Sequence, residues 1–137
     1  MKTIFLAGPM RGFATGEGRQ KTLAWREHAK HLLSDTFFVK HAYRGREKEE
    51  TFPDPKGAII RDKQDILEAD IIIVNDTFEN ATMIGTAMEV LFAFLNNKII
   101  IVFGDAHKGD YWFDYHATLR VNDLDAAIKV CKELFYE

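Results

Sequence analysis

Residues 59–94 read IIRDKQDILEADIIIVNDTFENATMIGTAMEVLFAF and contain a helix–strand–helix unit. Apolar residues recur at helical spacing in its first part, which predicts a helix over residues 56–69. Residues 70–75 follow as a strand whose apolar run has no polar alternation, which is typical of a parallel strand covered on both faces. Residues 84–96 form a second predicted helix. The unit therefore predicts a parallel sheet between two layers of helices.

The same alternation continues on both sides of this unit. Apolar runs predict four more strands, at residues 3–7, 36–39, 98–103 and 118–121. Amphipathic patterns predict helices over residues 17–33 and after the capping residue Asp123. The charged stretch at residues 41–55 and the aromatic, acidic stretch at residues 104–116 are predicted to be loops. We expect one domain spanning residues 1–137, α/β in class, with a flavodoxin-like sheet in the order 2-1-3-4-5.

Composition excludes several classes of protein. The chain has 137 residues, 47% of them hydrophobic, which suits one domain with one core. A net charge of −3 gives no basic face for nucleic acid. No apolar run approaches the roughly 20 residues of a membrane helix, and the N-terminal run is too short for a signal peptide. The single cysteine, Cys131, lies at a core position of the last helix and fits a reducing compartment. We expect a cytoplasmic protein.

The predicted sheet places two loops together. In a sheet of this order, ligands bind beyond the carboxyl ends of the strands where the strand order reverses, here between the first and third strands. The loops at this point are residues 8–18 and 76–84. The first is neither a dinucleotide fingerprint nor a P-loop. Gly8 and Gly12 allow backbone amides to approach a ligand, and Arg11 can pair with a phosphate. A tight turn with a solvated arginine is the alternative.

Glu89 is the residue that most suggests chemistry. It lies four residues after Gly85, and the residues that follow it, up to Leu95, are apolar. Burying a carboxylate costs several kcal/mol unless it is hydrogen-bonded or functional. A carboxylate in the first turns of this helix can attack a sugar carbon or stabilise an oxocarbenium-like centre. A glutamate that points to solvent is the alternative interpretation.

The other candidates are less specific. Asp62 and Asp65 share a helix face, and one of them can reach the site, although the residues alone favour a solvated face beside Arg61 and Lys63. The five histidines form no metal-ligand spacing and are expected at the surface. The aromatic residues of one loop can cover a base, contact a partner subunit or simply pack locally; they are Tyr111, Trp112, Phe113 and Tyr115. We expect no metal and no organic cofactor.

Three segments together resemble the nucleoside 2-deoxyribosyltransferase family. They are Ile4–Pro9 (IFLAGP), Asp62 eight residues before Asp70, and Gly85–Glu89 (GTAME). The resemblance covers most of the chain in the same order and spacing. It implies a flavodoxin-like fold and exchange of bases on 2'-deoxyribose. By this match Glu89 attacks the anomeric carbon and forms a covalent intermediate, Asp62 contacts and protonates the leaving base, and Gly8 and Pro9 with the loop that follows line the pocket.

The chain departs from the family pattern at two positions. Met83 stands where the family usually has an aspartate six residues before the glutamate, and Phe5 stands where it commonly has a tyrosine. Both positions, with Asp76 and Gly85, are expected to line the substrate pocket. These departures keep open the alternative of a non-catalytic nucleotide-binding module.

The first loop resembles a segment of related hydrolases, and this likeness affects the expected substrate. Hydrolases of the same superfamily cleave nucleoside 5'-monophosphates at the glycosidic bond, and their Ile-Arg-Gly-Gly-type segment resembles Met10-Arg11-Gly12 here. An N-glycosidase acting on monophosphates is therefore an alternative to the transferase. In either case the expected partners are a small nucleoside or nucleotide and a free base. The resemblance also implies a homo-oligomer in which a neighbouring subunit completes each site.

Overall fold

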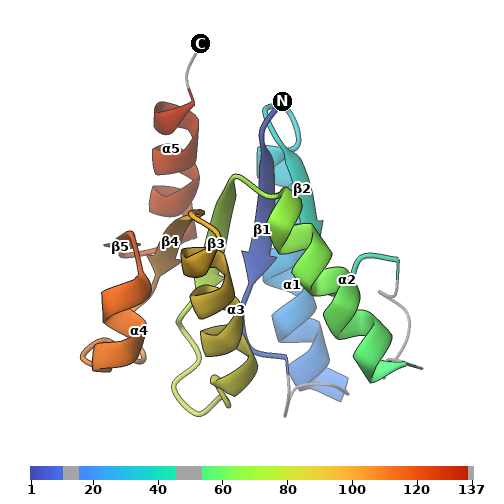
Figure 1. The fold of residues 1–137 in the computed structure, drawn as a ribbon, viewed down its shortest axis with the longest axis vertical. Helices are drawn as coiled ribbons and strands as arrows, with labels where there is room; N and C mark the ends of the chain where they lie inside the picture. Colours follow the sequence, from blue (N-terminus) through green and yellow to red (C-terminus); the bar gives the residue numbers. More distant parts are fainter. Residues whose placement is uncertain (11–15, 46–53, 136–137) are drawn as a thin grey trace.

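The computed structural model describes residues 1–10, 16–45 and 54–135 (Figure 1). Its five strands pair in parallel in the order β2-β1-β3-β4-β5, which confirms the predicted sheet. The strands are β1 (Thr3–Ala7), β2 (Phe38–His41), β3 (Ile71–Asn75), β4 (Ile99–Phe103) and β5 (Leu119–Val121). The helices are α1 (Gly16–Leu33), α2 (Pro55–Glu68), α3 (Ile84–Leu95), α4 (Tyr111–His116) and α5 (Leu124–Leu134).

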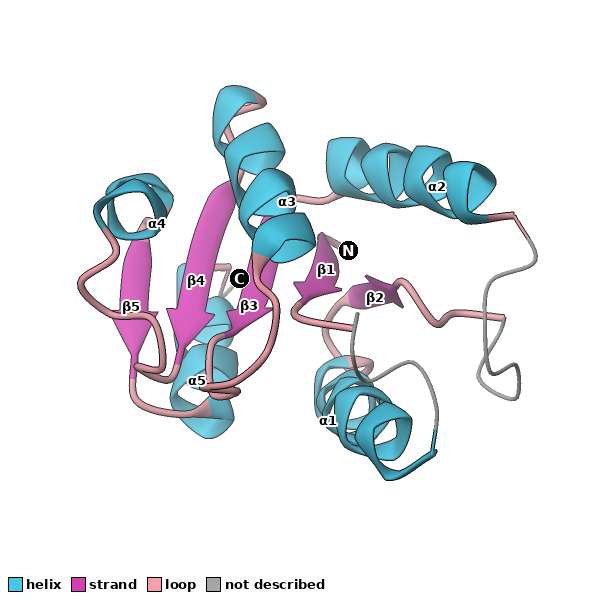
Figure 2. Cartoon of the chain, turned by 90° about the horizontal axis from the view of Figure 1, so that it is seen from below, coloured by secondary structure: helices cyan, strands magenta, loops and turns pink. Residues whose placement is uncertain are grey.

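The helices form a layer on each face of the sheet, with α1 and α5 on one side and α2, α3 and α4 on the other (Figure 2). Each layer covers its own apolar cluster. Ile4 and Leu6 of β1 pack with α1 and α5, whereas Phe5 and Ala7 pack on the side of α2 and α3. Because successive strand residues point to opposite faces, an apolar run without alternation supplies both clusters. None of the helices in the described part of the chain has the length and apolar character needed to cross a bilayer.

The ends of β1 and β3 lie level with each other at the point where the strand order reverses. Ala7, the last residue of β1, pairs with Val74, which precedes the last residue of β3. This register brings Gly8 against Asn75, since a Cβ built on Gly8 would lie 3.3 Å from the Asn75 Cβ. The two loops singled out from the sequence therefore start side by side.

Two expectations about β2 were wrong. The second strand spans Phe38–His41 rather than residues 36–39, because Phe38 pairs with Thr3 and His41 with Leu6. His41 is consequently fully buried and not a surface histidine.

The predicted loop at residues 104–116 contains helix α4. Asp110 caps it by accepting a hydrogen bond from the Phe113 amide at 3.0 Å, and Phe113 is buried in the core. A six-residue helix is too short to show a helical period in the sequence. Most of the charged stretch at residues 41–55 lies outside the described residues, at positions 46–53.

A left-handed glycine stands where β4 ends beside β3. Gly104 has a φ of +95°, and a Cβ on it would lie 2.5 Å from the Asp76 carbonyl oxygen and 2.7 Å from the Thr77 Cγ2. Gly109 has a φ of +99° but has open space around its Cα hydrogen. The two glycines thus share a backbone requirement and differ in their surroundings.

We predict that Gly104→Ala lowers the free energy of unfolding by about 3 kcal/mol, because strain of about 1 kcal/mol combines with a backbone clash. Gly109→Ala, the matched control, has only the strain and should cost about 1 kcal/mol. Urea unfolding of both variants measures the difference. Equal losses would show that the contact with Asp76 and Thr77 relaxes without cost.

Candidate active site

The carboxylates of Glu89 and Asp62 come together where α2 and α3 contact each other on one face of the sheet. Glu89 as a whole residue is half-buried, yet its carboxylate lies deep enough that loss of hydration is the main effect on it. Burial, and next the negative charge of Asp62, raise the pKa of Glu89 to about 8, and the Arg26 guanidinium opposes this rise. A carboxylate with a strongly raised pKa beside a second carboxylate is typical of general acid–base and glycosyl-transfer sites.

The structure separates the roles of Asp62 and Asp65, which helical spacing leaves undecided. Arg44 donates two hydrogen bonds to Asp65, at 2.9 and 2.8 Å, and the Lys40 ammonium lies 3.7 Å away. Asp65 therefore ties the segment after β2 to α2. Asp62 is the carboxylate whose charge acts on Glu89.

Gly8 forms the tight corner at the end of β1. A Cβ at this position would lie 3.1 Å from the Trp25 ring and 3.3 Å from the Asn75 Cβ, so only glycine fits without displacement. Pro9 is buried and Met10 is half-buried beyond it. Arg11 and Gly12, expected to contact a ligand, lie outside the described residues.

Arg26 of α1 is a residue of this region that sequence reasoning missed. It is only 1% exposed, and its guanidinium donates hydrogen bonds to the carbonyls of Gly8 at 2.8 Å and Thr22 at 2.7 Å. The signal was present in the helical pattern: the buried positions of α1 include 22, 26, 29 and 33, so an arginine occupies the core stripe. An arginine at such a position must find buried polar partners.

The other residues expected to line the substrate pocket differ in their burial and contacts. Phe5 is fully buried in the apolar cluster beneath α2 and α3. Met83 precedes α3, and its carbonyl accepts a hydrogen bond from the Ala87 amide at 2.7 Å. Gly85 is exposed, with open space where a Cβ would stand.

Asp76 is fully occupied by protein partners. Its carboxylate accepts hydrogen bonds from the His107 amide at 3.0 Å and from Arg120 at 2.8 Å, and it lies 2.6 Å from the His107 Nδ1. The side chain thereby fixes the loop after β4 and the start of β5. These contacts connect Asp76 with β5 and with the loop that follows β4.

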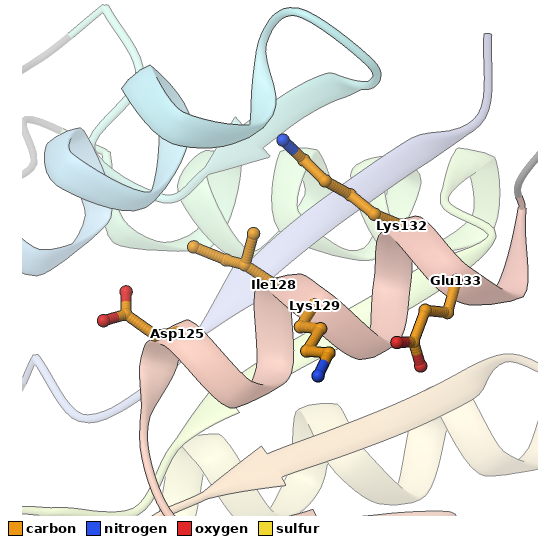
Figure 3. Close-up of a pocket in the computed structure, with 5 residues that line it drawn as sticks. All are labelled: Asp125, Ile128, Lys129, Lys132 and Glu133. Carbon is orange, nitrogen blue, oxygen red and sulfur yellow. The ribbon is translucent and has the colours of Figure 1, made fainter.

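Other surface features carry less chemistry. Within the described residues, no group of three or more His, Cys, Asp or Glu side chains is arranged to hold a metal. An open depression runs along α5 on the opposite face of the sheet, and its lining comes from that helix alone (Figure 3). The residues that line it are Asp125, Ile128, Lys129, Lys132 and Glu133. It therefore offers no combination of elements comparable to the region around Glu89.

Solved structures with the same fold include two enzymes. The 2-deoxyribosyltransferase of Bacillus psychrosaccharolyticus matches with a TM-score of 0.68 and 19% identity, over 92% of this chain and 90% of its own. The CMP N-glycosidase of Clostridium botulinum matches with a TM-score of 0.61 and 16% identity, over 98% and 100%. A conserved protein of Enterococcus faecalis matches with a TM-score of 0.70 and 13% identity, over 98% and 99%.

No family model and no curated protein matches the sequence. At these low identities the structural likeness shows the fold alone. The shared fold is the one that the sequence resemblance implied.

We predict that Glu89→Gln stabilises the protein in a pH-dependent way. Because the folded pKa of about 8 exceeds the ordinary value of 4.5, the folded state retains a proton that the unfolded state loses, and stability falls as pH rises between these values. Glutamine removes that loss. The gain in unfolding free energy should be near zero at pH 5 and roughly 2 kcal/mol at pH 8.5, after allowance for partial exposure.

Urea unfolding at the two pH values measures the gain. Glu133→Gln, which changes an exposed glutamate on α5, is the matched control and should show no such dependence. A gain from Glu89→Gln that is equal at both pH values would contradict charge burial as its cause.

Proposed function

We propose that this chain belongs to the nucleoside 2-deoxyribosyltransferase family and cleaves the N-glycosidic bond of 2'-deoxynucleosides. The observation that carries the proposal is the Glu89 carboxylate, which is deeply buried and feels the charge of Asp62. Two enzymes of this chemistry share the fold, one named a 2-deoxyribosyltransferase and one a CMP N-glycosidase. The segments around Gly8, Asp62 and Glu89 resemble the family in order and spacing.

The proposed reaction has two displacement steps at the anomeric carbon. A Glu89 carboxylate oxygen bonds to C1', the C1'–N bond breaks, and its electron pair goes to the base nitrogen, which takes a proton from the Asp62 carboxyl group. A second base then attacks C1' through a nitrogen and releases the Glu89 carboxylate. The proton of that nitrogen returns to Asp62, so the enzyme regains its starting state.

The electrostatics of the pair support a site in which two carboxyl groups share one proton, and attack requires that this proton has passed to Asp62. The reaction needs one ionised and one protonated carboxyl group at the same time. Each negative charge disfavours ionisation of the other, so the pair tends to hold a single proton. Protein carboxyl groups can therefore supply both the nucleophile and the acid. The proposal requires no metal or organic cofactor.

The fate of the covalent intermediate separates the two enzyme candidates. A base as acceptor gives the transferase, which we favour because the AGP and GTAME segments resemble that family most closely. Water as acceptor and a 5'-monophosphate as substrate give the N-glycosidase, which the likeness of Met10-Arg11-Gly12 to a phosphate-binding segment favours. The step at Glu89 is the same in both.

The helices on the Glu89 side of the sheet carry many exposed apolar side chains. On α3 they include Ile84, Met88, Leu91 and Leu95, at spacings of four, three and four residues, as at a helix–helix interface. Exposed apolar residues of α2 and α4 continue this surface: Ile59, Ile60, Leu67, Tyr111, Trp112 and Tyr115. We propose that a second copy of the chain packs on this face. Glu89 follows Met88 directly, so that copy would border the site.

We predict that the protein converts deoxynucleosides in the presence of a second free base. Glu89→Ala should lower turnover at least about a thousandfold because the nucleophile is lost. Asp62→Asn should lower it about a hundredfold because the proton donor is lost. Chromatography of reactions with each deoxynucleoside or deoxynucleoside 5'-monophosphate, with and without acceptor base, identifies the products. Glu133→Gln is the control and should retain activity.

Each product pattern selects one candidate. A new deoxynucleoside that requires the acceptor base supports the transferase. Free base and deoxyribose 5-phosphate released only from monophosphates support the N-glycosidase. Binding of nucleotide without turnover of any substrate would refute both enzymes and favour the non-catalytic binding module.

We predict that Leu95→Glu shifts the protein to a smaller species in size-exclusion chromatography with light scattering, because a charge would be buried between copies. Leu134→Glu changes an exposed leucine on α5, outside the apolar face, and should leave the mass unchanged. A wild-type monomer at micromolar concentration would contradict the proposed association.

A further inference from the structure

Arg26 is a buried cation at the carboxyl edge of the sheet. Its guanidinium lies 4.8 Å from the centroid of the Trp25 ring and 5.4 Å from that of Tyr43. With the hydrogen bonds to Gly8 and Thr22, these rings fix the group in one place. The side chain comes from α1, and its guanidinium contacts the Gly8 carbonyl directly after the end of β1.

Within residues 1–10, 16–45 and 54–135, this cation has no close anionic partner. Among the described residues, no carboxylate lies within 4.0 Å of Arg26, and its Nε–H donates no hydrogen bond in that part of the structure. Burial lowers the pKa of Arg26 to about 10, with Tyr43, Glu89 and Asp62 acting in the opposite direction. A buried charge without an ion pair is costly. The carboxylates that feel its field are those of the candidate catalytic pair.

We propose that Arg26 is a positioning residue that holds the Gly8 backbone at the edge of the pocket and makes ionisation of Glu89 for attack less costly. The positive charge favours the ionised form of Glu89 against burial and against Asp62. The bond to the Gly8 carbonyl fixes the turn that begins the ligand-side loop. The catalytic part of this inference rests on the proposed function, whereas its electrostatic part concerns the free protein.

Other charged groups around the site are engaged elsewhere. On α2, Arg61 donates to the carbonyls of Ala42 and Arg44, and Asp65 is paired with Arg44. Lys63 lies over the Phe92 ring at 5.0 Å. At the end of β3, Asp76 is held by His107 and Arg120. From α1 and α2, Arg26 and Asp62 are thus the groups whose charges act on Glu89.

The test compares three variants by ¹³C NMR titration of the Glu89 carboxyl carbon. Arg26→Gln removes the charge but retains an amide that can donate to the Gly8 carbonyl, and it should raise the Glu89 midpoint by about one unit. Arg26→Lys retains the charge and should stay within about half a unit of wild type. Tyr43→Phe removes the hydroxyl bonded to Thr22 at 2.9 Å and should leave the midpoint unchanged.

An unchanged Glu89 midpoint in Arg26→Gln would overturn the proposal. If that variant does not fold, Arg26→Lys decides alone: a midpoint raised by a full unit despite the retained charge overturns the proposal, and one near wild type supports it. The titration needs no substrate, so it remains decisive even if the protein turns over none of the substrates tested.

Activity gives a second readout that a purely structural role would not produce. In Arg26→Gln, kcat/KM should fall about tenfold at pH 7, and the deficit should shrink toward pH 9.5, where Glu89 ionises in both proteins. A deficit of constant size across this pH range would mean that Arg26 acts through packing alone, and would contradict the electrostatic role without affecting the proposed reaction.

Discussion

The level pairing of β1 with β3 is the constraint on which the rest of the structure depends. Because Ala7 and Val74 are partners, both strands end together at the reversal of strand order. The connections from these two ends leave to opposite faces of the sheet, α1 on one side and α3 on the other (Figure 2). Groups from the two helical layers can approach each other at this edge, and the charge of Arg26 on α1 acts on Glu89 of α3.

Charge is concentrated there at a considerable energetic cost. The Glu89 carboxylate and the Arg26 guanidinium are taken out of water, and loss of hydration is the main effect on the pKa of each. Elsewhere the buried charges are matched directly, as Asp65 is by Arg44 and Asp76 by Arg120. The contrast distinguishes groups that hold loops in place from groups whose protonation is set by the field around them.

The sequence predicted the sheet well because fully covered parallel strands read as unbroken apolar runs. It missed α4, since six residues carry no measurable period and the cap at Asp110 resembles a loop residue. Spacing along α2 did not separate Asp62 from Asp65, because that choice depends on where Arg44 lies in space. The sequence did not predict a buried Arg26, because arginine is normally a surface residue. Its helical spacing from the buried residues of α1 could nevertheless have indicated this position.

The two glycines of the site differ in how much change they tolerate. Gly8 is enclosed by Trp25 and Asn75, whereas nothing lies within 4 Å of a Cβ built on Gly85. In the proposed pocket, the end of β1 therefore accepts no side chain larger than glycine, whereas the start of α3 has room for one. Substrate range in proteins of this design can diversify by side chains that grow from the start of α3, with the opposite wall kept constant.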